Sequence, residues 1–126
     1  VLRQDDQGGV QSAVESLRLD QLPEGDVLVQ VSHSGVNYKD GLASIPNSSI
    51  VRRYPFVPGI DLAGTVVEST HPGFKPGDGV LCTGYELGVS HEGGFSQYAR
   101  VKGDWLLHLP DEDPCFRGAG ILRYWR

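Results

Sequence analysis

Glycine and proline interrupt this chain at short intervals, and this limits it to short structural elements. Its 126 residues include 17 glycines and 8 prolines, spread along the chain rather than clustered. Because these residues favour turns and break the interior of helices, the pattern predicts many short strands joined by turns and no long helices. With 39% hydrophobic residues, the chain can still bury one modest core. A mainly β domain with little helix is therefore expected.

Three segments have the pattern of buried strands. Residues 27–32 place valines at alternate positions directly after a Pro-Glu-Gly-Asp turn. Residues 60–68 contain the β-branched run Thr-Val-Val, and Gly64 within this segment indicates a bulge or a close backbone approach. Residues 80–82 are a short apolar run after a Lys-Pro-Gly-Asp-Gly turn. These segments are predicted to form the centre of the fold.

The remaining elements are weaker in pattern. Residues 95–101 and 105–110 flank a Lys-Gly-Asp turn and are predicted to pair as a hairpin. Residues 11–19 are assigned to a further strand, although their period is ambiguous, and helix is limited to a turn or two at residues 38–43. Five or six short strands indicate a small antiparallel barrel or sandwich. The aromatic and basic tail, residues 111–126, does not continue the pattern of the domain at residues 1–110.

Charge, hydropathy and cysteine content narrow the functional class. The formal net charge of −5 repels phosphate backbones on average, which disfavours a dedicated nucleic-acid binder. No apolar stretch approaches the roughly 18 to 20 residues that span a bilayer, so no membrane association and a cytoplasmic location are expected. Cys82 and Cys115 are too few for a disulfide scaffold. We expect two reduced thiols, with a single disulfide as the alternative.

Most polar clusters in the chain do not match a known catalytic pattern. The four histidines are too dispersed for a helical metal site, and none neighbours a cysteine, so no metal is expected. Adjacent side chains such as His91 and Glu92 point apart in an extended chain, which favours a surface turn over a catalytic dyad. Neither a nucleophile elbow nor a glycine-rich phosphate loop is present in the sequence.

The segment Ser34–Gly41 is the strongest candidate for a functional site. It gathers amide, phenol, ammonium and carboxylate groups directly after a predicted strand, and such density on a connection is typical of binding sites. A phenol donates to a carbonyl or a ribose hydroxyl, and a lysine favours an anionic phosphate or enolate. The alternative is a capped turn whose polar groups bond the local backbone. The residues alone leave the two interpretations open.

Several motifs resemble the medium-chain dehydrogenase/reductase superfamily. They run from about residue 27 to residue 110 and comprise SGVNYKDGLA at 34–43, YPFVPGIDLAGTV at 54–66, TGYELGVSHEGG at 83–94 and ARVKGDWL at 99–106. More narrowly, they resemble the acrylyl-CoA reductase branch of the zinc-independent quinone oxidoreductases. The resemblance implies a GroES-like, partly open β-barrel, followed in the family by a Rossmann domain that is not in this sequence.

The resemblance also implies the chemistry and the residues involved. The zinc enzymes of the superfamily have a cysteine ligand where Asn37 stands and a His-Glu pair where Ile60 and Asp61 stand, so no catalytic zinc is expected. In the zinc-independent branch, NADPH supplies hydride to an activated carbon–carbon double bond of an enoyl thioester or quinone. Tyr38 matches a cofactor-contacting tyrosine and is the predicted catalytic residue. Asn37, Tyr38 and Lys39 are the predicted cofactor-binding residues.

The resemblance covers one domain of a two-domain family, and this raises a second hypothesis. Truncation or a frame change near residues 111–118 is expected, and the isolated chain is expected to be inactive. The longer proteins of the family are expected to be homodimers. The alternative hypothesis is a non-catalytic β-barrel that serves as a binding module or is a remnant of an enzyme. Residues alone fix neither the substrate nor the preference for NADPH over NADH, because the nucleotide-reading residues belong to the other domain.

Overall fold

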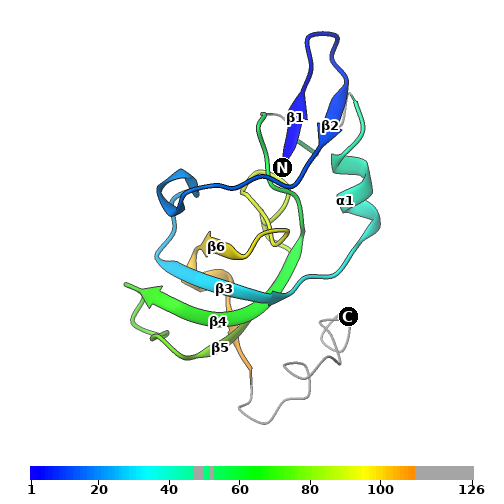
Figure 1. The fold of residues 1–126 in the computed structure, drawn as a ribbon. Helices are drawn as coiled ribbons and strands as arrows, with labels where there is room; N and C mark the ends of the chain where they lie inside the picture. Colours follow the sequence, from blue (N-terminus) through cyan, green and yellow to red (C-terminus); the bar gives the residue numbers. More distant parts are fainter. Residues whose placement is uncertain (47–49, 52, 110–126) are drawn as a thin grey trace.

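The computed structural model describes residues 1–46, 50–51 and 53–109. Within these ranges a five-stranded antiparallel sheet is the main element, and a separate two-stranded sheet lies beyond one end of it (Figure 1). The elements in chain order are β1 (Leu2–Gln4), β2 (Val10–Ser12), the 3-10 turn η1 (Leu19–Gln21), β3 (Val27–His33), α1 (Tyr38–Ala43), β4 (Asp61–Ser69), β5 (Gly79–Thr83), β6 (Tyr98–Val101), the 3-10 turn η2 (Gly103–Trp105) and β7 (Leu107–His108). The fold is mainly β with one short helix, as predicted.

The three central strands of the sheet are those with the clearest sequence pattern. The strand order is β6-β3-β4-β5-β7, so β3, β4 and β5 lie side by side. Gly64 of β4 faces Val31 of β3. A Cβ atom at Gly64 would overlap the backbone oxygen of Gln30, and the β3–β4 register shifts on both sides of this region. The predicted close backbone approach at Gly64 is therefore confirmed.

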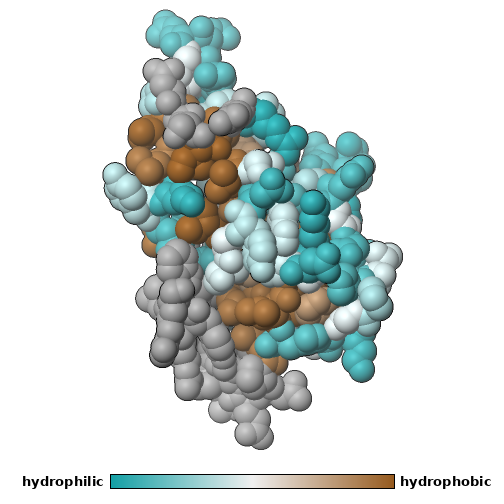
Figure 2. All heavy atoms as spheres, turned by 180° about the vertical axis from the view of Figure 1, so that it is seen from behind, coloured by the Kyte–Doolittle hydropathy of each residue, from teal (hydrophilic) through white to brown (hydrophobic). Residues whose placement is uncertain are grey.

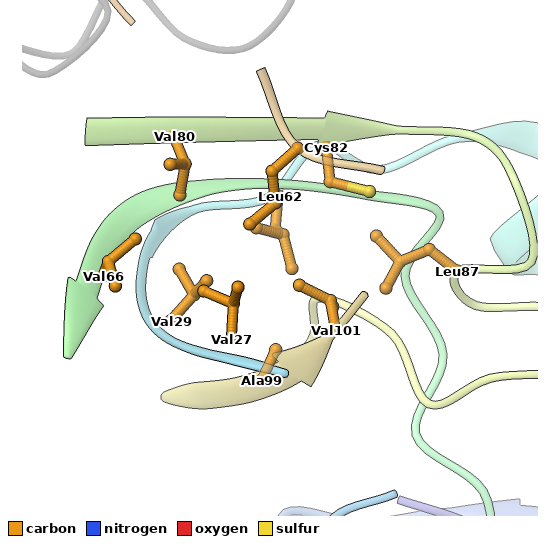
Figure 3. Packing of buried hydrophobic residues seen from close by; sticks show 10 residues of the cluster. Val27, Val29, Leu62, Val66, Val80, Cys82, Leu87, Ala99 and Val101 are labelled. Atoms are coloured by element: carbon orange, nitrogen blue, oxygen red, sulfur yellow. The ribbon is translucent and has the colours of Figure 1, made fainter. Parts of the chain in front are cut away.

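One main core lies on the concave face of this curved sheet (Figure 3). Its buried members come from every strand of the sheet except β7 and from the segments beside it: Val27, Val29, Leu62, Val66, Val80, Cys82, Leu87, Ala99, Val101 and Leu106. Ala63, Leu81 and Leu109 form a smaller cluster. Successive residues of β4, such as Leu62 and Ala63, thus enter different clusters, because successive side chains of a strand point to opposite faces.

A second cluster anchors the helix. Ala43 of α1 is fully buried and packs with Leu2, Val51 and Phe56. Leu2 and Phe56 also exchange two backbone hydrogen bonds, with N···O distances of 2.6 and 2.9 Å. Figure 2 shows apolar side chains in two separate areas, one in the half that carries α1 and one in the sheet half. The helix is therefore held by a small core of its own at one end of the sheet.

The predicted hairpin between residues 95–101 and 105–110 is wrong. Strands β6 and β7 lie at opposite edges of the sheet, where β6 pairs with β3 and β7 pairs with β5. The turn between them, η2, is tied to the start of β3, because the Gly103 amide donates to the Asp26 carboxylate at 2.6 Å. Leu106 then enters the main core. The chain therefore crosses the end of the barrel-like sheet instead of folding back on itself, and the sheet stays open.

Two further predictions need correction. Of residues 11–19, only 11 and 12 belong to a strand, and residues 11–20 are all exposed. Their polar side chains give no face that a sheet could bury. The segment at 91–94 is not a surface turn, because His91, Gly93 and Gly94 are buried. A Cβ at Gly93 would overlap the backbone of Gly59, so small residues let this loop pack against the chain.

The tail at residues 111–126 lies outside the described residues, as does Cys115. The proposed domain boundary at residue 110 therefore stays a prediction. No helix in the described part of the chain has both the length and the apolar character needed to span a membrane.

Candidate functional site

The candidate segment connects β3 to α1, and its backbone is fixed by the first turn of the helix. Asn37 is the N-cap residue, with φ −123° and ψ 157°. The carboxylate of Asp40, three residues later, accepts the Asn37 amide at 2.9 Å. This is the reciprocal half of a capping box, which satisfies an amide that the helix itself leaves without a partner. The sequence Asn-Tyr-Lys-Asp therefore begins the helix at Tyr38.

Two buried carboxylates attach this connection to β4. Asp61, 1% exposed, accepts the Gly35 amide at 2.6 Å and the Asn37 side-chain amide at 2.9 Å. Its backbone oxygen accepts the Ser34 hydroxyl at 2.8 Å. Asp40, 4% exposed, accepts the Ile60 amide at 3.1 Å in addition to that of Asn37. Hydrogen bonds to charged groups are among the stronger ones, so these contacts hold the connection firmly.

The two residues between Asn37 and Asp40 point outward. Tyr38 is 84% exposed, and Lys39 is exposed as well. Because successive helical residues are rotated by about 100°, Tyr38 and Lys39 leave the helix on a different side from Asp40. The structure thus separates the predicted site residues. Asn37 has the role of a capping and anchoring residue, whereas the phenol and the ammonium group are available to a ligand.

Asp61 is the residue that sequence reasoning about the site passed over. It was noted only as the position of a missing zinc ligand, and its structural task was not predicted. The signal was present, because a lone carboxylate inside the apolar run Ile-Asp-Leu-Ala must be buried with donors when the strand is central. Asn37 and Gly35, on the preceding connection, supply those donors.

The charge of Asp61 also affects a neighbouring thiol. Burial, and to a smaller extent the negative charge of Asp61, together raise the pKa of Cys82 from 9.0 to about 12. Cys82 is a free cysteine and belongs to the main core. Because the thiolate is the reactive form, Cys82 is a packing residue and not a nucleophile.

The histidines all lie in structural contacts. Hydrogen bonds join His33 Nδ1 to the Ser32 hydroxyl, His71 Nε2 to the Asp104 carboxylate, His91 Nε2 to the Arg100 carbonyl and His108 Nε2 to the Gly73 carbonyl. Over the ranges that the structure describes, no three His, Cys, Asp or Glu side chains are grouped so that they could hold a metal ion.

A second group of side chains joins the loop after β5 to the 3-10 turn η2. The ring of Tyr85 stacks on that of Trp105, with 5.9 Å between centroids and 8° between planes. Tyr85 has a φ of 56°, which costs a non-glycine residue roughly 1–2 kcal/mol. Aromatic stacking returns about 0.5–1.5 kcal/mol. The two contributions nearly cancel, so the tyrosine adds little to the stability of the fold.

Fold and site together place the chain in a known class. Residues 23–111 match the alcohol dehydrogenase GroES-like domain, and the chain belongs to that family. It is 50% identical over 109 residues to acrylyl-CoA reductase AcuI of Ruegeria pomeroyi, covering 86% of this chain and 33% of that protein. The chain spans about a third of the length of the curated relatives it matches.

Two solved structures share the fold closely. The structure of YhdH from E. coli K-12, which contains bound NADPH, superposes with a TM-score of 0.82 at 48% identity, covering 87% of this chain and 34% of that one. The structure of YhfP from Bacillus subtilis, which contains bound NAD, superposes with a TM-score of 0.81 at 49% identity, covering 87% and 33%. The predicted GroES-like fold is therefore confirmed.

Proposed function

We propose that this chain is the N-terminal domain of an NADPH-dependent, zinc-independent reductase that acts on an activated carbon–carbon double bond, with an enoyl-CoA thioester such as acrylyl-CoA as the substrate and a quinone as the alternative acceptor. The longer protein would act as a cytoplasmic homodimer. The 50% identity to an acrylyl-CoA reductase supports the reaction class. The NADPH-bound relative supports the cofactor.

One structural observation carries the proposal to particular residues. At the start of α1, where Asp40 is turned into the fold, Tyr38 is 84% exposed although tyrosine is a large aromatic residue. Burying such a ring would stabilise the domain, so its exposure favours a role outside the domain's own packing. Because the neighbouring Asn37 and Asp40 are held by hydrogen bonds, the backbone from which the Tyr38 ring projects has a fixed position.

The residues fit the nicotinamide end of NADPH better than its phosphates. A phenol hydroxyl donates a hydrogen bond to a carboxamide or to an acceptor carbonyl, and the Lys39 ammonium attracts a phosphate or a developing enolate. No glycine-rich dinucleotide fingerprint is present in the sequence, so affinity for the pyrophosphate must come from elsewhere. Hydride transfer is the chemistry that NADPH supplies when it is bound.

In this arrangement the domain's own residues orient and polarise the reacting carbonyl or carboxamide group. Tyr38 would hold the reacting carbonyl or carboxamide by a hydrogen bond, and Asn37 would hold the segment on β4 through Asp61. The chain alone should show no turnover, because its sequence has no glycine-rich fingerprint for the pyrophosphate.

The proposal is tested with a chimera. Residues 1–109 are joined to the C-terminal two thirds of the Ruegeria pomeroyi relative, and the loss of NADPH absorbance is followed with acrylyl-CoA and with a quinone. We expect turnover with acrylyl-CoA, and about a tenfold loss of kcat/KM in Tyr38→Phe, the effect of one productive hydrogen bond. Val36→Ala is the matched control, because Val36 is 88% exposed on the same connection.

Two results would refute the proposal. A folded chimera that consumes NADPH with neither acceptor would favour a non-catalytic binding module. Unchanged turnover and NADPH affinity in both Tyr38→Phe and Asn37→Ala would remove the assigned site.

A further inference from the structure

The loop after β5 presents an open aromatic ring on a fixed base. Tyr85 is 67% exposed although it stacks on Trp105. Trp105 is itself half-buried and packs against the main core, and the buried ring of His91 meets it edge-on, with 5.1 Å between centroids and 84° between planes. His91 is fixed in turn by its 2.6 Å hydrogen bond to the Arg100 carbonyl. The Tyr85 ring therefore rests on a rigid support.

A cation lies over the tryptophan ring of this stack. The Lys102 ammonium is 5.5 Å from the centroid of the Trp105 ring, within the range of a cation–π contact. The open ring of Tyr85 and the positive charge of Lys102 thus share Trp105 as their contact, and the three residues are here called the aromatic platform. Glu86 and Asp104 are the acidic neighbours in sequence, and Asp104 is engaged by His71 at 3.0 Å. A flat ring that carries an anionic group is the complementary ligand.

The backbone at Tyr85 adds a second observation. Among the described residues it is the one non-glycine residue with a positive φ, and Gly84 before it has a φ of 84°. Glycine would adopt both conformations without strain. Strained residues that persist with little gain in packing are concentrated at ligand-binding sites. The strain favours a task for the tyrosine ring beyond covering Trp105.

The platform is connected to the helix that carries Tyr38. The Gly84 amide donates to the Ile60 carbonyl at 3.1 Å, and the Ile60 amide donates to the Asp40 carboxylate at 3.1 Å. Thr83, the last residue of β5, pairs with Asp61, the first residue of β4. The loop of Tyr85 and the start of α1 therefore leave the same end of the β4–β5 pair, where one extended substrate could contact both.

We propose that the aromatic platform binds the 3′-phosphoadenosine end of a CoA thioester, with the adenine ring on the open face of Tyr85 and the phosphate near Lys102. This inference rests on the proposed function, in which a CoA thioester is the substrate. Adenine bound through its face to an aromatic side chain is a favourable stack, and an ammonium group distinguishes a phosphorylated ribose from an unphosphorylated one.

The test uses the 126-residue chain with Trp125→Phe, which leaves Trp105 as the sole tryptophan. Adenosine 3′,5′-bisphosphate is titrated while NMR follows the indole N–H signal of Trp105. We expect a saturable shift. In Tyr85→Gly, which keeps the backbone conformation, the affinity should fall about tenfold at an unchanged melting temperature. Tyr85→Phe should retain the affinity of the parent chain, and Lys102→Gln should weaken binding several-fold. Phe95→Ala is the control for stacking on another exposed ring.

Comparison ligands identify the source of the phosphoadenosine. Tighter binding of the 3′,5′-bisphosphate than of adenosine 2′,5′-bisphosphate supports the thioester, and the reverse order, which would indicate NADPH, overturns it. Equal affinity for AMP would refute the part assigned to Lys102. An unshifted Trp105 signal, or equal affinity in Tyr85→Gly, would refute the platform.

The chimera separates this inference from the proposed function. Tyr85→Gly should raise the KM for acrylyl-CoA about tenfold, with a much smaller effect on kcat. An active chimera whose KM for acrylyl-CoA is unchanged by this substitution would refute the platform and would not affect the proposed reductase function. A chimera without activity, built on a chain that binds the 3′,5′-bisphosphate as expected, refutes the reductase and supports the platform.

Discussion

Replacing Asp61 should destabilise the domain more than any exposed substitution. Asp61→Ala removes the acceptor for the Gly35 amide and for the Asn37 side chain. Each donor left without a partner costs about 1–3 kcal/mol, so the free energy of unfolding should fall by roughly 2–6 kcal/mol. Domains of this kind are stable by about 5–15 kcal/mol, so the loss is a large part of the total. Urea unfolding followed by circular dichroism measures it.

Three controls make this prediction specific. Asp61→Asn retains one carbonyl oxygen and should cost about half as much. Glu68→Ala removes an exposed carboxylate from the same strand and should stay within about 0.5 kcal/mol of the parent chain. Because Asn37→Ala removes one partner of the same contact, it should combine non-additively with Asp61→Ala. An Asp61→Ala chain as stable as Glu68→Ala would refute the assignment of Asp61 as an anchor.

Two other predictions concern packing and pH. Gly64→Ala should lower the free energy of unfolding by several kcal/mol, because the new methyl group meets the Gln30 backbone. Gly41→Ala, in open space on α1, should raise it by about 0.5–1 kcal/mol. Thermal melting compares the two variants, and equal effects would contradict the close approach at Gly64. The raised pKa of Cys82 means that the unfolded chain loses its proton first. Stability should therefore fall by about 1.4 kcal/mol per pH unit from pH 9 toward 12, a component that Cys82→Ala should lack; a parallel decline in both chains would contradict it.

The sequence predicted the centre of the fold better than its edges. The segments at 27–32, 60–68 and 80–82 became β3, β4 and β5 because a buried strand imposes its period on the sequence. The predicted hairpin between residues 95–101 and 105–110 was wrong because strand order depends on tertiary contacts. The anchoring of Gly103 by Asp26, which redirects the chain between β6 and β7, joins residues 77 positions apart and leaves no local signal.

The surface turn predicted at residues 91–94 was wrong for a different reason. Its glycines are needed because Gly93 and Gly94 approach the backbone of Gly59 and Asp61 too closely for a side chain. Local composition does not distinguish a mobile glycine from a tightly packed one. The density of polar residues was enough to find the candidate segment. The different roles of the inward Asn37 and the outward Tyr38 could be assigned only once the first residue of the helix was known.

That division has a consequence for how variation in this segment would be tolerated. Asn37 and Asp40 are held by contacts within the domain, while Tyr38 and Lys39 between them face outward. A mutational library scored for cellular abundance would therefore penalise changes at 37 and 40, and the same library in the full-length enzyme, scored for growth that requires the reaction, would add penalties at 38 and 39. Four adjacent codons would thus carry two independent selective pressures, so the chemistry of the outer pair can diverge while the inner pair preserves the scaffold.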